Sequence, residues 1–169
     1  MEAIVAAAGA IVDRLQGGGT LYTCGNGGSA AEAMHLAEEL IGRYGGRDRP
    51  PQRAICLNAD ATALTCIAND FGFDEIFARQ CRALLTGRDA LVVMSTSGES
   101  ENIVRALQAA RERGALTIGL LGREGGRCRP LCDHAIIVDG DDAARIQEAH
   151  LVIAHLFCEA VEQAAAGRP

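Results

Sequence analysis

The sequence contains no tryptophan and only four prolines, and its seven cysteines are an odd number without the spacing of a disulfide framework or a zinc ribbon. Unpaired thiols are typical of a reducing compartment, and the first residues lack the basic start of a signal peptide, so we expect a cytoplasmic protein. No apolar run approaches the ~18 residues of a membrane-spanning helix, and we therefore expect no membrane-bound segment.

Basic residues are also scarce, with 16 Lys and Arg against 22 Asp and Glu and a formal net charge of −6. Binding to the phosphate backbone of DNA or RNA requires a basic stripe, which this chain lacks, so we expect no nucleic-acid partner. The 169 residues are 49% apolar, which is enough to bury one core. Because no linker or low-complexity stretch interrupts the chain, we expect a single domain over residues 1–169.

Short apolar segments, bounded by turn formers, alternate with helical patterns along the chain. We expect strands at residues 21–24, 54–57, 90–94, 117–121 and 135–138. We expect an N-terminal helix within residues 1–17 and further helices at residues 29–43, 73–86, 100–113 and 142–166. Strands this short and aliphatic are typical of a buried parallel sheet, and the alternation places helices on both of its faces. The sequence therefore predicts an α/β fold with a doubly wound, five-stranded parallel sheet.

Two loops rich in glycine and hydroxyl groups each follow a predicted strand and precede a predicted helix. Residues 24–29 read Cys-Gly-Asn-Gly-Gly-Ser, and residues 95–100 read Ser-Thr-Ser-Gly-Glu-Ser. Small residues let the backbone approach a ligand closely, and hydroxyls with free N–H groups at a helix start bind anions. Ligands of open parallel sheets bind outside the carboxyl ends of the strands, so we expect these loops to hold one phosphate and its attached polyol. Ser29 is also placed where it could cap the helix that follows.

Histidine and carboxylate side chains supply a second set of candidates. His35 and Glu39 are one helical turn apart, so they share a face and can converge on one metal ion or one substrate. His155 lies in an apolar stretch of the last helix, where local sequence alone favours a core histidine. Gln147 and His155 are separated by ~12 Å of helix rise, so their spacing does not establish a common site.

The final predicted helix, at residues 142–166, is apolar around most of its middle turns. A helix of this kind is buried, and a domain of this size has difficulty burying one on its own. We therefore expect a homo-oligomer.

Together these motifs resemble the phosphoheptose isomerases, the sedoheptulose 7-phosphate isomerase branch of the sugar-isomerase (SIS) domain proteins. The resemblance extends from about Gly18 to about Glu162. It is carried by the following segments: 24–29, 34–40 with Gly42-Arg43-Tyr44, 69–73, 95–100, and 145–148 with His150 and His155. One departure is Ala144, where some members carry aspartate, so that a polar role there is lost or moves to Asp142.

The resemblance implies a flavodoxin-like SIS domain, a homotetramer with active sites shared between subunits, and one zinc ion per site. It implies that zinc is held by His35, Glu39, Gln147 and His155, and that Glu39 and His155 are the catalytic base and acid. The residues it places on the substrate are Asn26, Gly27, Gly28, Ser29, Glu39, Arg43, Asn69, Asp70, Ser95, Thr96, Ser97, Ser100 and Gln147.

The implied reaction converts sedoheptulose 7-phosphate to D-glycero-D-manno-heptose 7-phosphate by proton transfer through an enediol, in the synthesis of heptose precursors for lipopolysaccharide core or another glycan. One alternative is a non-catalytic SIS-domain adaptor that binds the replication initiator. Such adaptors are expected to lack the histidine found here at position 155, and this residue favours the enzyme. Another alternative, a sugar-phosphate sensor, usually carries a DNA-binding domain, for which 169 residues leave no room.

Overall fold

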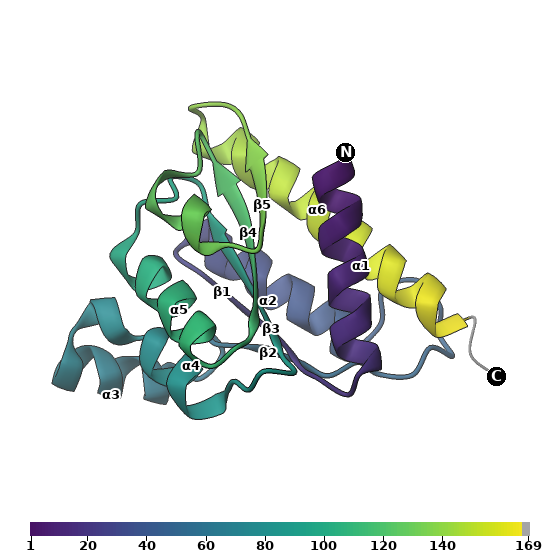
Figure 1. The fold of residues 1–169 in the computed structure, drawn as a ribbon, viewed down its shortest axis with the longest axis horizontal. Helices are drawn as coiled ribbons and strands as arrows, with labels where there is room; N and C mark the ends of the chain where they lie inside the picture. Colours follow the sequence, from purple (N-terminus) through teal and green to yellow (C-terminus); the bar gives the residue numbers. More distant parts are fainter. Residues whose placement is uncertain (167–169) are drawn as a thin grey trace.

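The computed structural model describes residues 1–166 and contains one five-stranded sheet of order β2-β1-β3-β4-β5 (Figure 1). All neighbouring strands are parallel. The strands are β1 (Leu21–Gly25), β2 (Ala54–Cys56), β3 (Ala90–Ser95), β4 (Leu116–Gly122) and β5 (His134–Val138). This order is that of a flavodoxin-like, doubly wound sheet, which confirms the predicted fold class.

Helices cover both faces of the sheet (Figure 1). One face packs against α1 (Glu2–Gln16), α2 (Gly28–Ile41) and α6 (Ala143–Ala166). The other packs against α3 (Ala61–Phe71), α4 (Ala78–Leu84) and α5 (Glu101–Glu112), with short 3₁₀ turns at η1 (Phe73–Glu75) and η2 (Gly126–Leu131). None of the helices within residues 1–166 is long and apolar enough to cross a membrane.

The two cores explain why the strands are continuous apolar runs. All six residues of β3 are buried, because successive side chains point to opposite faces and each face is covered. Val92 packs into the core under α1, α2 and α6, and the next residue, Val93, packs into the core under α3, α4 and α5.

The helix predicted at residues 73–86 is wrong as a single element, and α3 was not predicted. The segment is divided into η1 and the shorter α4. The preceding helix, α3, begins at Asp60, whose carboxylate accepts hydrogen bonds from the N–H groups of Thr62 and Ala63, and it ends at Gly72, where φ is 91°. Leu64, Ile67, Ala68 and Phe71 recur at helical spacing along α3, so its sequence carries an apolar stripe that could have marked it as a helix, although only Ile67 is buried.

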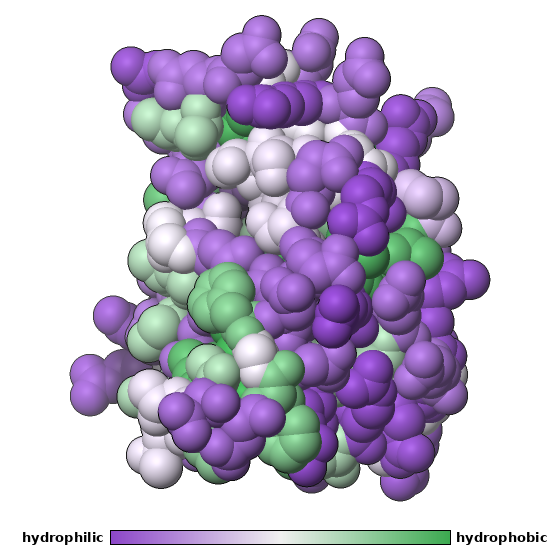
Figure 2. Space-filling model, turned by 90° about the vertical axis from the view of Figure 1, so that its left-hand side faces the viewer, coloured by the Kyte–Doolittle hydropathy of each residue, from purple (hydrophilic) through white to green (hydrophobic). Residues whose placement is uncertain are grey.

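The last helix extends over the predicted range and is buried along one side only in the single chain. On its inner side His150, Ala154 and Phe157 are fully buried, whereas Val152 on its outer side is 60% exposed. The side of the molecule formed by the α3, α4 and α5 layer is mostly hydrophilic, with one continuous run of apolar side chains in its lower left part (Figure 2).

Candidate active site

Both glycine and hydroxyl loops lie where the strand order reverses. The first connects β1 to α2 and the second connects β3 to α5, and Gly25 of β1 pairs with Met94 of β3. The side-chain amides of Asn26 and Asn102 donate to each other across the two loops, with both N–O distances 2.9 Å. Asn102, which is only 2% exposed and was not predicted, therefore fixes the loops against each other.

The shape of the second loop is set by its own hydroxyls and a glycine. Ser95 Oγ accepts a hydrogen bond from the N–H of Gly98 at 3.0 Å, and Ser97 Oγ accepts one from the N–H of Glu99 at 3.2 Å. Gly98 has a φ of 67°, and a side chain there would collide with the backbone of Gly125. Ser100 is the N-cap residue of α5, yet no side chain caps this helix, so its first N–H groups are free to bind an anion.

The first loop differs from the prediction in one respect. The N-cap residue of α2 is Gly27, with a φ of 56°, so the expectation that Ser29 caps this helix is wrong. Because α2 begins at Gly28, Ser29 is already helical, and it is 3% exposed. Gln147 of α6 lies directly against Gly28, where an added Cβ atom would be 2.8 Å from Gln147 Oε1. Gly28 thus lets α6 approach the start of α2.

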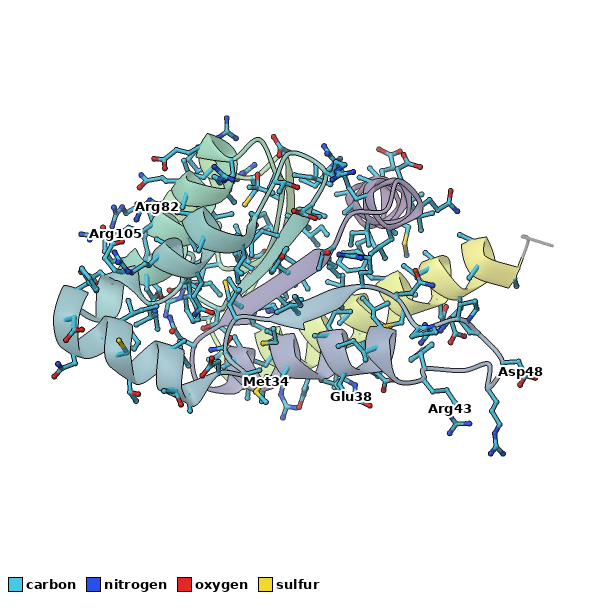
Figure 3. The ribbon with its side chains drawn as sticks, turned by 90° about the horizontal axis from the view of Figure 1, so that it is seen from below. Met34, Glu38, Arg43, Asp48, Arg82 and Arg105 are labelled. Carbon is cyan, nitrogen blue, oxygen red and sulfur yellow. The ribbon has the colours of Figure 1, made fainter. Side chains whose placement is uncertain are left out.

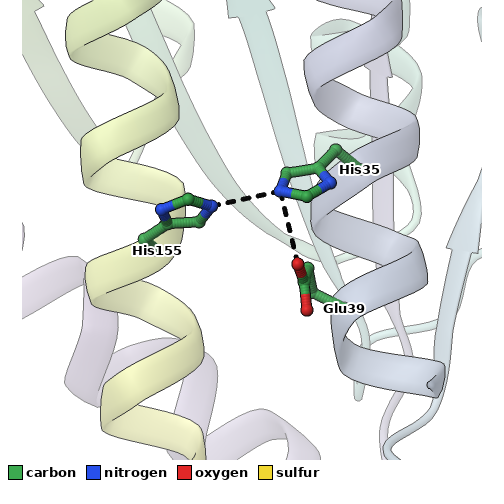
Figure 4. Close-up of side chains that lie close together, drawn as sticks. All are labelled: His35, Glu39 and His155. Carbon is green, nitrogen blue, oxygen red and sulfur yellow. Dashed lines mark hydrogen bonds and ion pairs between the residues drawn. The ribbon is translucent and has the colours of Figure 1, made fainter. Parts of the chain in front are cut away.

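Further along the same two helices, His35 and Glu39 of α2 meet His155 of α6 (Figure 4). The Nε2 atoms of His35 and His155 are 3.1 Å apart, and His35 Nε2 is 3.4 Å from Glu39 Oε1. All three side chains are partly exposed, so His155 is not the core histidine that its neighbours in the sequence favour. That description fits His150, which is fully buried earlier on the same helix.

The three side chains suit a metal ion. One ligand atom from each of His35, Glu39 and His155 lies within 4.8 Å of the others. Ligand atoms bound to a tetrahedral zinc ion at its usual distances are about 3.3 Å apart, close to the two separations given above. Two imidazoles and a carboxylate are also the set found in open zinc sites, which keep the fourth position for water or substrate. The donor set and its spacing therefore fit a metal site.

Neighbouring side chains orient the two histidines. Glu38 Oε2 lies 3.7 Å from His35 Nδ1, so its charge favours a proton on Nδ1 and leaves Nε2 as the metal-facing lone pair. The ring of Tyr44 lies 5.3 Å from that of His155, centroid to centroid, and its hydroxyl donates to Glu159 at 3.2 Å. Tyr44 belongs to a motif that carried the resemblance, but no role was predicted for it.

Three of the predicted substrate residues lie apart from the metal group within one chain. Arg43 is exposed and projects from the loop that follows α2 (Figure 3). Asn69 and Asp70 are exposed at the end of α3, on the other face of the sheet, where Asn69 Nδ2 donates to Asp70 Oδ1 at 2.8 Å. These placements are those expected if a site takes residues from more than one subunit.

Two further carboxylates differ in their use. Asp142 Oδ1 accepts a hydrogen bond from the N–H of Ala144 at 2.9 Å, so it caps the start of α6. Glu32 lies one turn before His35 on α2, and its Oε2 atom is buried without a hydrogen-bond partner. Burial raises the pKa of Glu32 to about 7, so this carboxyl titrates near neutral pH, which its sequence neighbours do not reveal.

Comparison with known proteins agrees with this geometry. A family model described as "SIS domain" matches residues 1–122. The parallel sheet and the two loops at its switch point, together with this match, define the chain as a SIS-domain protein.

Individual relatives of high sequence identity define the family within the SIS-domain class. A phosphoheptose isomerase from a Nitratiruptor species is 47% identical over 152 residues, 90% of this chain and 81% of that protein. The one from Solidesulfovibrio magneticus is 48% identical over 161 residues, 95% of this chain and 78% of that protein. The solved structure of a phosphoheptose isomerase from Francisella tularensis matches with a TM-score of 0.92 and 38% identity, covering 96% of this chain and 86% of that one. The chain belongs to the phosphoheptose isomerase family, and the adaptor alternative finds no support in these relatives.

Proposed function

We propose that the protein is an aldose–ketose isomerase that converts sedoheptulose 7-phosphate to D-glycero-D-manno-heptose 7-phosphate, a precursor for lipopolysaccharide core or another glycan. The observation that carries the proposal is the convergence of His35, Glu39 and His155 between α2 and α6, where α2 itself begins at one of the two anion-binding loops. Family membership at 47% identity over 90% of the chain supports this reaction.

The two loops bind the phosphate and the sugar hydroxyls. Backbone N–H groups at the starts of α2 and α5 face the phosphate, and the neighbouring hydroxyl and amide groups orient the chain of the sugar. On this proposal the substrate is bound by Asn26, Gly27, Gly28, Ser29, Glu39, Arg43, Asn69, Asp70, Ser95, Thr96, Ser97, Ser100 and Gln147.

Isomerisation moves a proton between C1 and C2 of the sugar. Glu39 removes the proton from C1, next to the carbonyl carbon, and returns it to C2. His155 transfers the proton of the C1 hydroxyl to the carbonyl oxygen on C2. Zinc, held by His35, Glu39, Gln147 and His155, would supply positive charge to polarise the carbonyl. The imidazole of His35 orients Glu39 through the contact at 3.4 Å.

We propose that the enzyme is a homotetramer in the cytoplasm. The seven free cysteines support a reducing compartment. The exposed apolar side chains of Met34 and Ile41 on α2 and of Val152 on α6 support a subunit interface over these helices. An interface of this kind would supply Arg43, Asn69 and Asp70 from neighbouring subunits. Light scattering is expected to give four times the 17.7 kDa chain mass, and a monomer at micromolar concentration would contradict the proposal.

The activity is tested by NMR of sedoheptulose 7-phosphate with the purified protein. We expect signals of the aldose 7-phosphate to appear. Their growth should stop after treatment with a chelator and resume when zinc is added. Zinc-loaded protein that leaves the ketose unchanged would contradict the isomerase function. Turnover that survives complete metal removal would contradict the role of zinc only.

A further inference from the structure

The last turn of α2, which contains Glu39, is capped by a residue from outside the helix. The last turn of α2 has no basic residue of its own, and its C-cap is Gly42. The final carbonyl groups of a helix lack partners within it and form the negative end of its dipole. Arg49 supplies the missing donors, since its Nη2 donates to the carbonyl of Glu39 at 2.7 Å and its Nη1 to the carbonyl of Leu40 at 2.9 Å.

The same guanidinium also binds α6. Arg49 Nε donates to Glu162 Oε1 at 3.0 Å, and the two side chains are only 5% and 19% exposed. Glu162 lies on the same face of α6 as His155, about two turns further along. Its carboxylate also accepts hydrogen bonds from the N–H groups of Gly45 at 2.9 Å and Gly46 at 3.2 Å. The loop that carries these groups, marked by Arg43 and Asp48 in Figure 3, runs from the end of α2 past this part of α6.

This arrangement connects the two halves of the metal group. Two of its side chains, His35 and Glu39, come from α2, and the third, His155, comes from α6, so their convergence depends on the separation of these helices. Among the contacts between the helices, the guanidinium of Arg49 binds the main chain of Glu39 itself on one side and α6 on the other. With the carbonyl of Pro50, to which Nη1 also donates at 2.9 Å, its planar fork binds four acceptors at once, which the three donors of a lysine could not do.

We propose that Arg49 and Glu162 form a clamp that sets the separation of α2 and α6 and so preorganises the metal group. The inference rests on the proposed function, because it assigns a role toward the metal that this function requires. Both residues are positioning residues. Partners that orient ligands without touching the metal commonly contribute about 10- to 100-fold to metal affinity.

The test is a titration of the metal-free protein with Co²⁺, followed by the visible absorption of the bound ion. We expect Arg49→Gln to weaken cobalt binding by about 10- to 100-fold. The matched control is Arg47→Gln, which makes the same charge change in the same loop at an exposed residue without an ion pair among the described residues, and should shift affinity less than twofold. Equal affinities for Arg49→Gln and the wild type, or an equal loss in the control, would overturn the clamp.

Two further variants keep the test decisive if Arg49→Gln does not fold, as judged by circular dichroism. Glu162→Gln keeps the shape but removes the charge, and Arg49→Lys keeps the charge but not the fork; both should weaken cobalt binding at least threefold, and wild-type affinity in both would overturn the clamp. In a folded double variant, Arg49→Gln with Glu162→Gln should lose little more than Arg49→Gln alone. A fully additive loss would contradict joint action.

The same titration separates this inference from the proposed function. If the wild type binds cobalt and the variants lose affinity, but NMR shows no isomerisation, the proposed reaction fails and the clamp stands. If the wild type isomerises the sugar phosphate but the variants bind cobalt as it does, the clamp fails and the reaction stands. A wild type that binds no cobalt overturns the clamp as a device for the metal.

Discussion

The ion-pair network beside α4 and α5 and the metal group between α2 and α6 lie on opposite faces of the sheet and arrange their charged groups in opposite ways. On the side of α4 and α5, Glu75 pairs with Arg82 and Arg105, both at 2.9 Å, and the pairing continues through Arg105 to Glu101 at 2.7 Å. On the side of α2 and α6, the acceptor atoms of His35, Glu39 and His155 converge without an ion pair to any arginine of residues 1–166, although Arg49 pairs with Glu162 about two turns further along α6. Charges that neutralise each other hold elements together, whereas lone pairs that converge without a counter-charge can bind a cation or a proton.

The carboxyl pKa values follow the same division. Hydrogen bonds from Arg82 and Arg105 lower the pKa of Glu75, which therefore stays ionised. Burial without a partner raises the pKa of Glu32 to about 7, so this carboxyl titrates near neutral pH. The first behaviour is that of a structural ion pair and the second is common at functional sites.

The largest effect is expected when the proposed acid or base on the side of α2 and α6 is removed. We expect Glu39→Gln and His155→Ala each to lower kcat by ~10²–10⁴-fold or more, because each removes a positioned acid or base. Steady-state assays on zinc-loaded protein measure this, with light scattering to verify that the oligomer is intact. Near wild-type turnover in either variant would show that the role given to that residue is wrong.

A second test concerns His150, whose buried ring nitrogens have no hydrogen-bond partner of ordinary geometry within residues 1–166. Burial lowers its pKa to about 4, an effect that the nearby main chain of Leu121 only partly opposes. Since the unfolded chain binds this proton near pH 6.5 and the folded chain does not, stability is full above pH 6.5 and falls by up to about 3 kcal/mol as the pH drops to 4.

Urea unfolding of metal-free protein between pH 7 and pH 4 measures this slope. In His150→Leu the part of the slope due to His150 should disappear, although burial of a different shape will shift the absolute stability. An unchanged slope would show that His150 is hydrogen-bonded or charged in the folded protein.

Most of the fold was predictable because each strand is marked by a short apolar run in the local sequence. The apolar runs marked the strands to within one or two residues, as with the strand predicted at 21–24 and observed at Leu21–Gly25. The missed helix, α3, carries Leu64, Ile67, Ala68 and Phe71 at helical spacing, so apolar periodicity was sufficient to predict it. Its start signal, an aspartate before a helical stretch, was present in the sequence.

The site was predictable only where partners are close in the chain. His35 and Glu39 share one turn, but His155 is 120 residues from His35, and their meeting followed from the resemblance alone. Asn102 and Arg49 were not predicted, because their partners lie 76 and 113 residues away and single polar residues carry no periodic signal. Such contacts are decided by tertiary packing.

A smaller effect is expected in the phosphate loop. Ser97→Ala should raise KM for the sugar phosphate more than it lowers kcat, with a roughly ten- to hundredfold loss of kcat/KM, because hydrogen bonds to a charged phosphate contribute ~1.5–3 kcal/mol. Ser97→Asp should be worse, because it places a negative charge where the phosphate binds. Steady-state kinetics of both variants test this, and an unchanged KM in Ser97→Asp would show that the phosphate binds elsewhere.

The smallest effect is expected on the side of α4 and α5, where we expect the ion pairs to contribute to stability and not to activity. Glu75→Gln removes two ion pairs that join η1, α4 and α5, and partly exposed pairs of this kind contribute at most about 1 kcal/mol to stability. Because the folded state lowers the pKa of Glu75, this contribution is present above pH 4.5 and is lost as the pH falls through the folded pKa. Urea unfolding at pH 7 and pH 3 should therefore show a small difference from the wild type at the higher pH only. Turnover and cobalt affinity should not change, and a tenfold loss of either would mean that the α4 and α5 network also acts on the site.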